Sequence, residues 1–110
     1  MSWVGVDFDG TLAQYEEWRG PTELGEPILP MIQRVRRWLD DGIEVRIVTA
    51  RANLDESVKA IGLWSIKYLG QPLVVTDQKD FAMIEIWDDR AVTVERNTGR
   101  QLTPSLLDEK

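Results

Sequence analysis

The sequence contains neither cysteine nor histidine. The absence of cysteine excludes a disulfide framework, a thiolate nucleophile and a cysteine metal site. The absence of histidine excludes the Ser-His and Cys-His nucleophile pairs and every imidazole metal ligand. Any catalysis by this chain must therefore use carboxylates, hydroxyls, lysine and arginine, together with a hard metal ion if a metal takes part.

Basic residues are also scarce, with 13 lysines and arginines against 19 acidic residues and a net charge of −6. This balance disfavours sequence-independent duplex binding, which depends on cationic side chains that contact phosphates. The net negative charge does not exclude a phosphorylated substrate, because a bound divalent cation can reverse the local sign of an acidic site. The chain has no apolar run approaching the ~20 residues of a membrane span and no signal-peptide pattern at its start. We therefore expect a cytoplasmic protein that does not enter a membrane.

The length of 110 residues and the hydrophobic content of 43% predict a single domain over residues 1–110. Apolar residues that recur at spacings of three and four predict helices over residues 28–41 and 54–69. Asn53 or Asp55 is expected to cap the second helix. Short apolar runs are typical of buried strands. The predicted strands cover residues 3–6, 43–48, 73–75 and 84–87.

The remaining segments read as turns and loops. Residues 13–27 contain glycines and prolines and predict a loop or small flap. One helical turn is expected over residues 80–83, a hairpin between residues 91–94 and 100–102, and a loosely held tail over residues 103–110. Strands that alternate with helices in this order predict an α/β fold, a Rossmann-like parallel sheet sandwiched by helices. In such sheets ligands bind beyond the carboxyl ends of the strands.

Each predicted strand ends in a residue that can bind phosphate or metal. In chain order these residues are Asp7 and Asp9, Thr49, Lys79, and Asp88 and Asp89. Residues two apart in an extended chain point the same way, so Asp7 and Asp9 can face one site. Because the carboxyl ends of parallel strands meet at one edge, we expect all these side chains to converge there.

A group of carboxylates would repel a phosphomonoester dianion. The pattern therefore implies a hard, oxygen-ligating cation, Mg²⁺. Asp7 and Asp88 would supply carboxylate ligands, and Lys79 would offset their charge and hold a phosphoryl oxygen. The Thr49 hydroxyl and nearby backbone N–H groups, including that of Ala50, would bind another phosphoryl oxygen.

The run Asp7-Phe8-Asp9-Gly10-Thr11-Leu12 resembles the DxDGT signature of the haloacid dehalogenase superfamily of phosphatases. Thr49, Lys79 and the Asp88-Asp89 pair are similar to its second, third and fourth motifs, in that order over about residues 3–90. The resemblance implies that Asp7 is a nucleophile that forms an aspartyl-phosphate. It implies that Asp9 is a general acid and base whose backbone carbonyl ligates the metal, and that Asp89 binds metal or orients Lys79.

The resemblance also implies a member without a cap domain, because residues 13–27 are too few for one. Tyr15, Trp18 and Arg19 in this flap are either packing residues or substrate contacts. Arg51 either contacts substrate or forms a structural ion pair.

An open site is compatible with several substrates. The leading interpretation is a Mg²⁺-dependent phosphomonoesterase acting on a small phosphorylated metabolite or a nucleotide. A polynucleotide-end phosphatase with the same chemistry is the alternative, and a non-catalytic binding module with this fold is the third. A second copy of the chain in a homo-oligomer would also be able to complete the open site.

Overall fold

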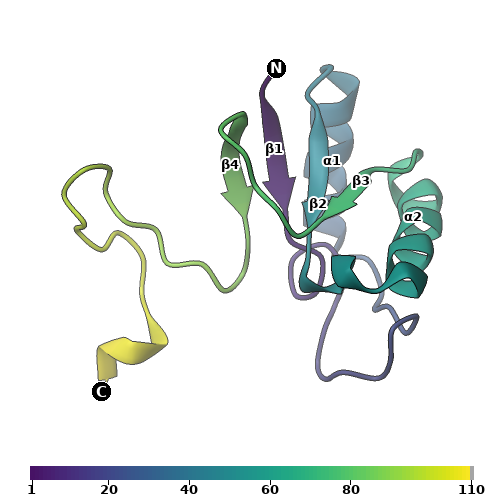
Figure 1. Ribbon diagram of the computed structural model, residues 1–110, viewed down its shortest axis with the longest axis horizontal. Coiled ribbons are helices and arrows are strands. Elements are labelled where there is room, and N and C mark those ends of the chain that lie inside the picture. The colour runs from purple at the N-terminus through teal and green to yellow at the C-terminus, as the bar shows by residue number, and fades with distance from the viewer. Residues whose placement is uncertain (110) are drawn as a thin grey trace.

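The structure is a computed structural model that describes residues 1–109, so the last residue of the predicted tail, Lys110, lies outside the described residues (Figure 1). Its helices and strands follow the predicted order. They are β1 (Trp3–Val6), α1 (Leu29–Asp40), β2 (Val45–Val48), the 3₁₀ helix η1 (Ala50–Asn53), α2 (Asp55–Leu69), β3 (Val74–Thr76), β4 (Met83–Trp87) and the 3₁₀ helix η2 (Leu106–Glu109).

The four strands form one sheet in the order β3-β2-β1-β4, and every neighbouring pair is parallel. Val4 lies beside Val45 of β2 and beside Glu85 of β4. The prediction of an α/β fold with a parallel sheet is therefore confirmed. Among the described residues, no helix is both long enough and apolar enough to cross a membrane.

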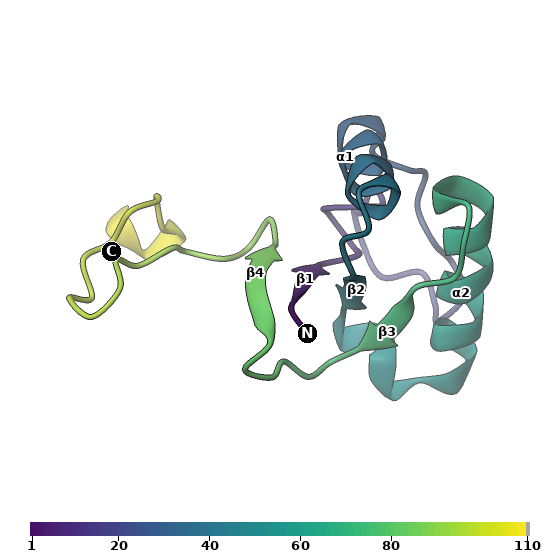
Figure 2. The same ribbon diagram turned by 90° about the horizontal axis from the view of Figure 1, so that it is seen from above.

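One hydrophobic core lies between the sheet and the two α-helices. Val4 and Val6 of β1 share it with Val35 of α1 and with Ile61 of α2. Alternate residues of a strand point to the same face, so both helices pack against the same side of the sheet. Figure 2 shows α1 beside that face and α2 at the β3 end of the sheet.

The prediction of helices on both faces is wrong for the described residues. A helix on the second face would belong to the connection from β3 to β4, but this connection has only residues 77–82 and contains no helix. The expected helical turn over residues 80–83 is reduced to a single hydrogen-bonded turn, in which the Met83 N–H donates to the Asp80 carbonyl at 3.2 Å, and Met83 already begins β4. Ile84 and Ile86 on the second face are consequently exposed.

The connection over residues 77–82 crosses the second face from β3 to the start of β4 (Figure 1). It covers Trp3, which is fully buried and donates its indole N–H to Asp80 Oδ1 at 2.8 Å. Arg46 lies over the same ring, 4.4 Å from its centroid. A short crossover and a stacked arginine thus replace the missing helix at this position.

The prediction that Asn53 or Asp55 caps α2 is also wrong. Leu54 is the N-cap residue, and no side chain accepts a hydrogen bond from the first turn. The reason is the preceding η1, which reaches Asn53 and leaves one extended residue before α2 begins. Asp55 and Glu56 instead lie in the first turn, where their charge is favourable to the helix dipole.

Residues 91–109 form a separate projection beyond β4 (Figures 1 and 2). The expected hairpin is reduced to a single bridge between Val94 and Gln101. Arg100 pairs with Glu95 at 2.8 Å, and η2 lies within the predicted tail. The hydrogen bonds of this described segment are made within it.

Candidate functional site

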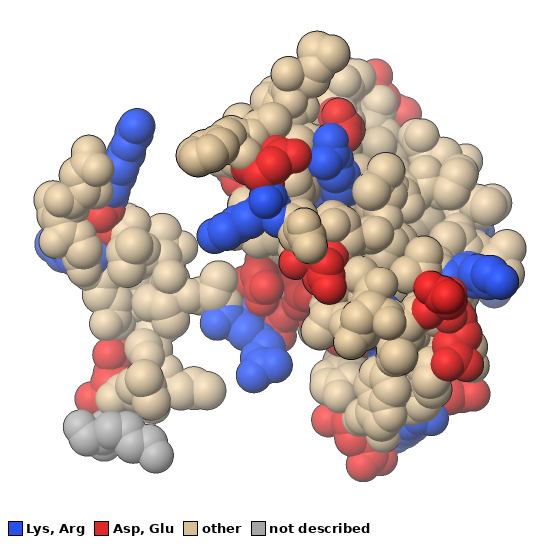
Figure 3. Space-filling view, in the orientation of Figure 1, with Lys and Arg blue, Asp and Glu red and all other residues tan. Residues whose placement is uncertain are grey.

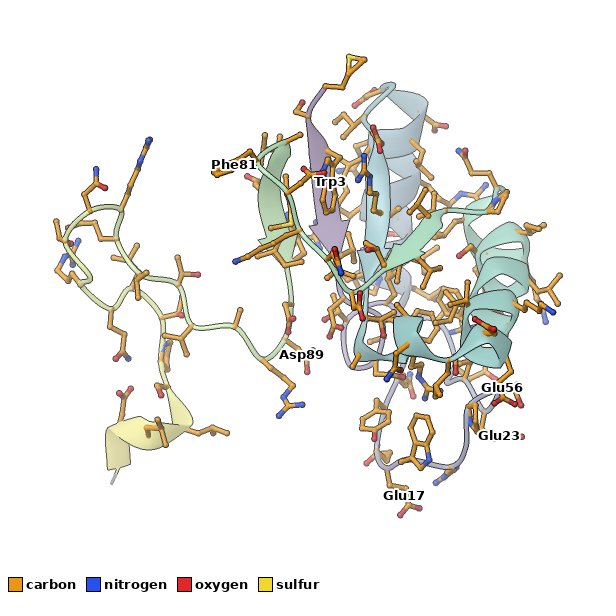
Figure 4. The ribbon with its side chains drawn as sticks, in the orientation of Figure 1. Trp3, Glu17, Glu23, Glu56, Phe81 and Asp89 are labelled. Atoms are coloured by element: carbon orange, nitrogen blue, oxygen red, sulfur yellow. The ribbon has the colours of Figure 1, made fainter. Side chains whose placement is uncertain are left out.

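Three carboxylates gather at the carboxyl ends of β1 and β4. Asp7 follows β1, and its backbone N–H donates to the Trp87 carbonyl at 2.8 Å. This bond extends the β1–β4 pairing by one residue and brings Asp7 beside Asp88 and Asp89. One ligand oxygen from each of the three lies within 4.8 Å of the others, and Asp89 is seen at the lower end of β4 in Figure 4. We call Asp7, Asp88 and Asp89 the acidic group.

The acidic group lies where ligands bind in this type of sheet. From β1 the chain moves to β2 on one side, whereas β4 lies on the other side and is reached across the opposite face. The strand order therefore reverses between β1 and β4, and this is the topological switch point. The predicted convergence of the first and last strand ends is confirmed.

The electrostatics of Asp7 are unfavourable to a bare carboxylate. Partial burial, the nearby charge of Asp88 and a contact with the Asp89 side chain raise the pKa of Asp7 from 3.8 to about 7, against the opposing effect of the Phe8 backbone N–H. Near neutral pH this carboxyl group therefore favours either a proton or a bound cation.

Gly10 and Thr11 support this group, although the sequence assigned them no individual role. The Thr11 hydroxyl donates to Asp89 Oδ1 at 3.0 Å and accepts the Asp89 backbone N–H at 3.1 Å. Gly10 has φ +86°, and a Cβ there would lie 2.5 Å from Asp89 Oδ2. A side chain at Gly10 would therefore displace the carboxylate. The adjacent Gly10 and Thr11 were the only hint of this role in the sequence, but Asp89, which they contact, lies 78 residues beyond Thr11 along the chain.

The Asp9 side chain does not join the acidic group. Its Oδ2 accepts from Arg51 Nε at 2.7 Å, and its Oδ1 accepts from Arg51 Nη2 at 3.2 Å. The Arg51 side chain is only 4% exposed. Of the two roles open to Arg51, the structure therefore contains the ion pair, and its partner is Asp9.

The flap is held against η1 and α2 by hydrogen bonds to its backbone carbonyls. Arg51 Nη1 donates to Gly20 and Pro21 at 3.1 Å each. Ser57 of α2 also donates to the Pro21 carbonyl, at 2.6 Å, and the Trp64 indole donates to that of Gly25 at 3.0 Å. The flap is thus an ordered loop beyond the carboxyl ends of the strands (Figure 1).

The three flap residues predicted as packing or substrate contacts lie mostly at its surface. Tyr15 and Trp18 are about half exposed. One face of Trp18 lies against Arg51, whose guanidinium carbon is 4.6 Å from the ring centroid. Arg19 forms an exposed pair with Glu17 at 3.5 Å. Trp18 thus packs on one side and leaves about half of its surface free.

Thr49 lies at the carboxyl end of β2, as predicted, and is buried. Its hydroxyl accepts the Arg51 backbone N–H at 3.1 Å and retains its own proton for donation. Ala50 follows as the exposed first residue of η1. Lys79 lies in the crossover after β3, is exposed, and within the described residues forms no ion pair within 4.0 Å. The predicted contact of Lys79 with the carboxylates is therefore not made here.

The acidic group fits a hard divalent cation. It offers three carboxylate oxygens close together, which is the ligand chemistry of Mg²⁺. Within the described residues no lysine or arginine pairs with these carboxylates, so the neighbours that raise the Asp7 pKa are not balanced by a protein cation. A cation at this position would relieve that repulsion.

No family model, curated protein or solved structure matches the chain. Any function for it therefore depends on the geometry and chemistry of this site.

Proposed function

We propose that the chain is a Mg²⁺-dependent phosphomonoesterase of the haloacid dehalogenase type. The observation that carries the proposal is the acidic group at the switch point, where three carboxylates meet, no lysine or arginine among residues 1–109 pairs with them, and the pKa of Asp7 is raised to about 7. Such an arrangement destabilises the free protein at neutral pH, so a function that uses a bound cation accounts for it better than a structural role does.

The residues divide the work as follows. The side chains of Asp7, Asp88 and Asp89, together with the Asp9 backbone carbonyl, would hold Mg²⁺. When bound, the ion would neutralise phosphate charge and polarise a phosphoryl oxygen. The Thr49 hydroxyl would donate to another phosphoryl oxygen. Lys79, which forms no ion pair among residues 1–109, would reach the phosphate when substrate is bound.

The reaction would proceed in two displacements at phosphorus, with Asp7 as the nucleophile of the first and water as the nucleophile of the second. An Asp7 oxygen attacks phosphorus and the ester P–O bond breaks. Asp9, which binds a proton from solvent before this step, gives that proton to the departing alkoxide. This leaves an aspartyl-phosphate on Asp7. Asp9, now ionised, takes a proton from a water molecule that attacks phosphorus, and the Asp7–phosphate bond breaks to release inorganic phosphate. The protonation state of Asp9 is restored at the end of the cycle.

The flap favours a small substrate over a polynucleotide end. A cavity of about 300 Å³ lies within it, lined by four glutamates with a single arginine, Arg19. Those glutamates are Glu16, Glu17, Glu23 and Glu26. Figure 3 shows acidic side chains around the lower end of the body, and Figure 4 labels Glu17 and Glu23 there. A polyanion would be repelled by this surface, whereas a substrate with one phosphate group held at the metal would not.

We further propose that the enzyme has no cap domain. Residues 7–28 connect β1 to α1 and contain only the flap, and one 3₁₀ helix and one α-helix occupy the stretch between β2 and β3. A leaving group would then meet the flap or a second copy of the chain.

Phosphate release in the presence of Mg²⁺ tests the proposal. The panel would contain nucleotides, sugar phosphates, alkyl phosphates, p-nitrophenyl phosphate, and oligonucleotides phosphorylated at either end. We expect release from small esters that stops in excess EDTA and is absent in Asp7→Asn. Hydrolysis that persists unchanged in EDTA would contradict the proposal. Binding of a phosphorylated compound without any release would favour the binding module instead.

A further inference from the structure

All five N–H donors of Arg51 are used, and they divide between two parts of the molecule. Two of the bonds go to the two oxygens of Asp9. Nη1 donates to the Gly20 and Pro21 carbonyls, and Nη2 donates to that of Glu23 at 3.4 Å. Arg51 therefore bonds simultaneously to the side chain proposed as the general acid and to the flap backbone.

We propose that Arg51 is a positioning residue that joins Asp9 to the flap, so that the orientation of the Asp9 carboxylate and the closure of the flap depend on each other. This inference rests on the proposed function for its catalytic consequence only. The link itself is a property of the fold and is testable without any turnover.

Only arginine suits this position. Its planar guanidinium presents donors in several fixed directions, so it binds both carboxylate oxygens and still reaches the backbone on the other side. Its flat surface also stacks on Trp18. A lysine ammonium has the same charge but three donors at a single nitrogen, and it cannot span Asp9 and three carbonyls at once.

The location of Arg51 connects this link to the neighbouring site groups. It follows Thr49 by two residues, and its backbone N–H bonds to the Thr49 hydroxyl. Thr49 N–H in turn donates to the Thr76 carbonyl at 2.8 Å, which anchors the start of η1 to β3. The guanidinium is thus attached to a segment that is anchored at a strand end.

Two consequences follow. If the flap moves away, Arg51 loses the bonds to Gly20, Pro21 and Glu23, and Asp9 loses part of what orients it. If Asp9 is removed, the guanidinium loses its charged partner in a buried position and the flap loses a fixed anchor. Each change on one side should therefore be measurable on the other.

Arg46 provides a matched control. It also stacks on a tryptophan, Trp3, and pairs with carboxylates, at 2.6 Å to Glu44 and 3.6 Å to Asp80. It lies five residues earlier on the second face of the sheet and contacts neither Asp9 nor the flap. A substitution at Arg46 therefore removes a comparable ion pair and stacking contact without touching the proposed link.

Limited trypsin digestion tests the link without turnover. Arg19 lies in the flap and is exposed, so the rate of cleavage after it, divided by that after Lys67 in α2, reports flap opening. Asp9→Ala should raise this ratio at least about threefold, while Asp7→Ala, two residues away, should leave it unchanged. Equal ratios in Asp9→Ala and wild type would overturn the inference.

Kinetics test the catalytic consequence. Arg51→Met should lower kcat for an alkyl phosphate about tenfold or more, because a misplaced acid matters for a poor leaving group. The kcat for p-nitrophenyl phosphate, whose leaving group needs no proton, should change far less. Arg51→Lys should not restore the kcat for the alkyl phosphate. Arg46→Met should leave the ratio of the two esters at its wild-type value.

The outcomes separate this inference from the proposed function. Equal losses for both esters in Arg51→Met would overturn the positioning role while leaving the phosphatase intact. If the wild type hydrolyses neither ester, the proposed function is wrong. The digestion ratio in Asp9→Ala then still tests whether Arg51 links Asp9 to the flap. If Arg51→Met does not fold, Asp9→Ala and Arg51→Lys still decide both questions.

Discussion

Asp7 and Asp9 leave the same strand end two residues apart, yet their surroundings are opposite. Asp7 faces Asp88 and Asp89 and has a raised pKa of about 7. Asp9 faces Arg51, which donates to both of its oxygens. Asp7 pairs with no lysine or arginine among residues 1–109, whereas Asp9 pairs with Arg51. The difference indicates which of the two is available to a metal or a phosphorus atom.

The separation arises because the chain turns immediately after Asp7. The Phe8 carbonyl accepts hydrogen bonds from Leu12 and Ala13, so residues 8–13 are not extended. Phe8 itself is fully buried against Trp64, with ring centroids 4.9 Å apart. The period-two rule that places Asp7 and Asp9 on one side holds only in an extended strand. The turn directs the second carboxylate toward Arg51 instead.

The largest expected effect is that of Asp7→Asn. An amide keeps the shape of the carboxylate but is a poor nucleophile and a weaker metal ligand, so phosphate release should fall by more than the ~10²–10⁴-fold typical of losing an acid or base. Release from p-nitrophenyl phosphate is the measurement. Circular dichroism and the melting temperature in EDTA control for folding, and the variant should be at least as stable as wild type. Residual activity within about tenfold of wild type would contradict the nucleophile role.

Asp9→Asn should have a smaller effect that depends on the leaving group. Loss of the general acid should slow hydrolysis of an alkyl phosphate by about 10²–10⁴-fold and that of p-nitrophenyl phosphate much less. The measurement is kcat for each ester in wild type and variant. Similar losses for both esters would mean that Asp9 does not protonate the leaving group.

Lys79→Ala should lower kcat/KM with little change in the melting temperature. The exposed side chain makes no ion pair within the described residues, so its removal costs the free protein little. The loss of a positive charge beside the phosphate should cost about tenfold or more. Lys67→Ala in the last turn of α2 is the matched control and should behave as wild type. Inactivity of Lys67→Ala together with a normal Lys79→Ala would place the third motif at Lys67.

The smallest effect concerns the stability of the metal-free protein. Because the pKa of Asp7 is about 7 in the fold against an ordinary 3.8, the folded state binds more protons than the unfolded state between these values. The free energy of unfolding in EDTA should therefore fall as pH rises from 5 to about 7 and level off above it. Urea denaturation across this range measures the slope.

Two variants and the metal sharpen this result. Asp7→Asn should flatten the slope, because it removes the carboxyl group with the raised pKa, whereas Asp9→Asn leaves Asp7 in place and should keep the slope. Mg²⁺ at about 100 times its dissociation constant should add about 2.7 kcal/mol at pH 8 by binding the folded state. If the free energy of unfolding of the wild type did not depend on pH in this range, the carboxylates of the acidic group would not repel one another as their geometry indicates.

Much of the fold could be predicted from the chain alone, because it depends on local patterns. The apolar spacing of residues 28–41 and 54–69 predicted α1 and α2 to within one residue at each end. Strand ends at Val6, Val48 and Trp87 were also predicted, and with them the positions of Asp7, Thr49 and Asp88. The prediction of a helix on the second face failed because the six residues between β3 and β4 are too few to form a helix that crosses the sheet.

The sequence by itself determined which chemistry is open to this protein. Without histidine and cysteine it has carboxylates, hydroxyls and cationic side chains, and their order along the chain places them at successive strand ends. Only the tertiary structure decided how these groups pair. Thr11 meets Asp89 78 residues away, and Asp9 meets Arg51 42 residues away. Periodicity reports which way a side chain points from its own element. The partner of a charge depends on which distant segments the packing of the core brings beside it, and no local pattern encodes that.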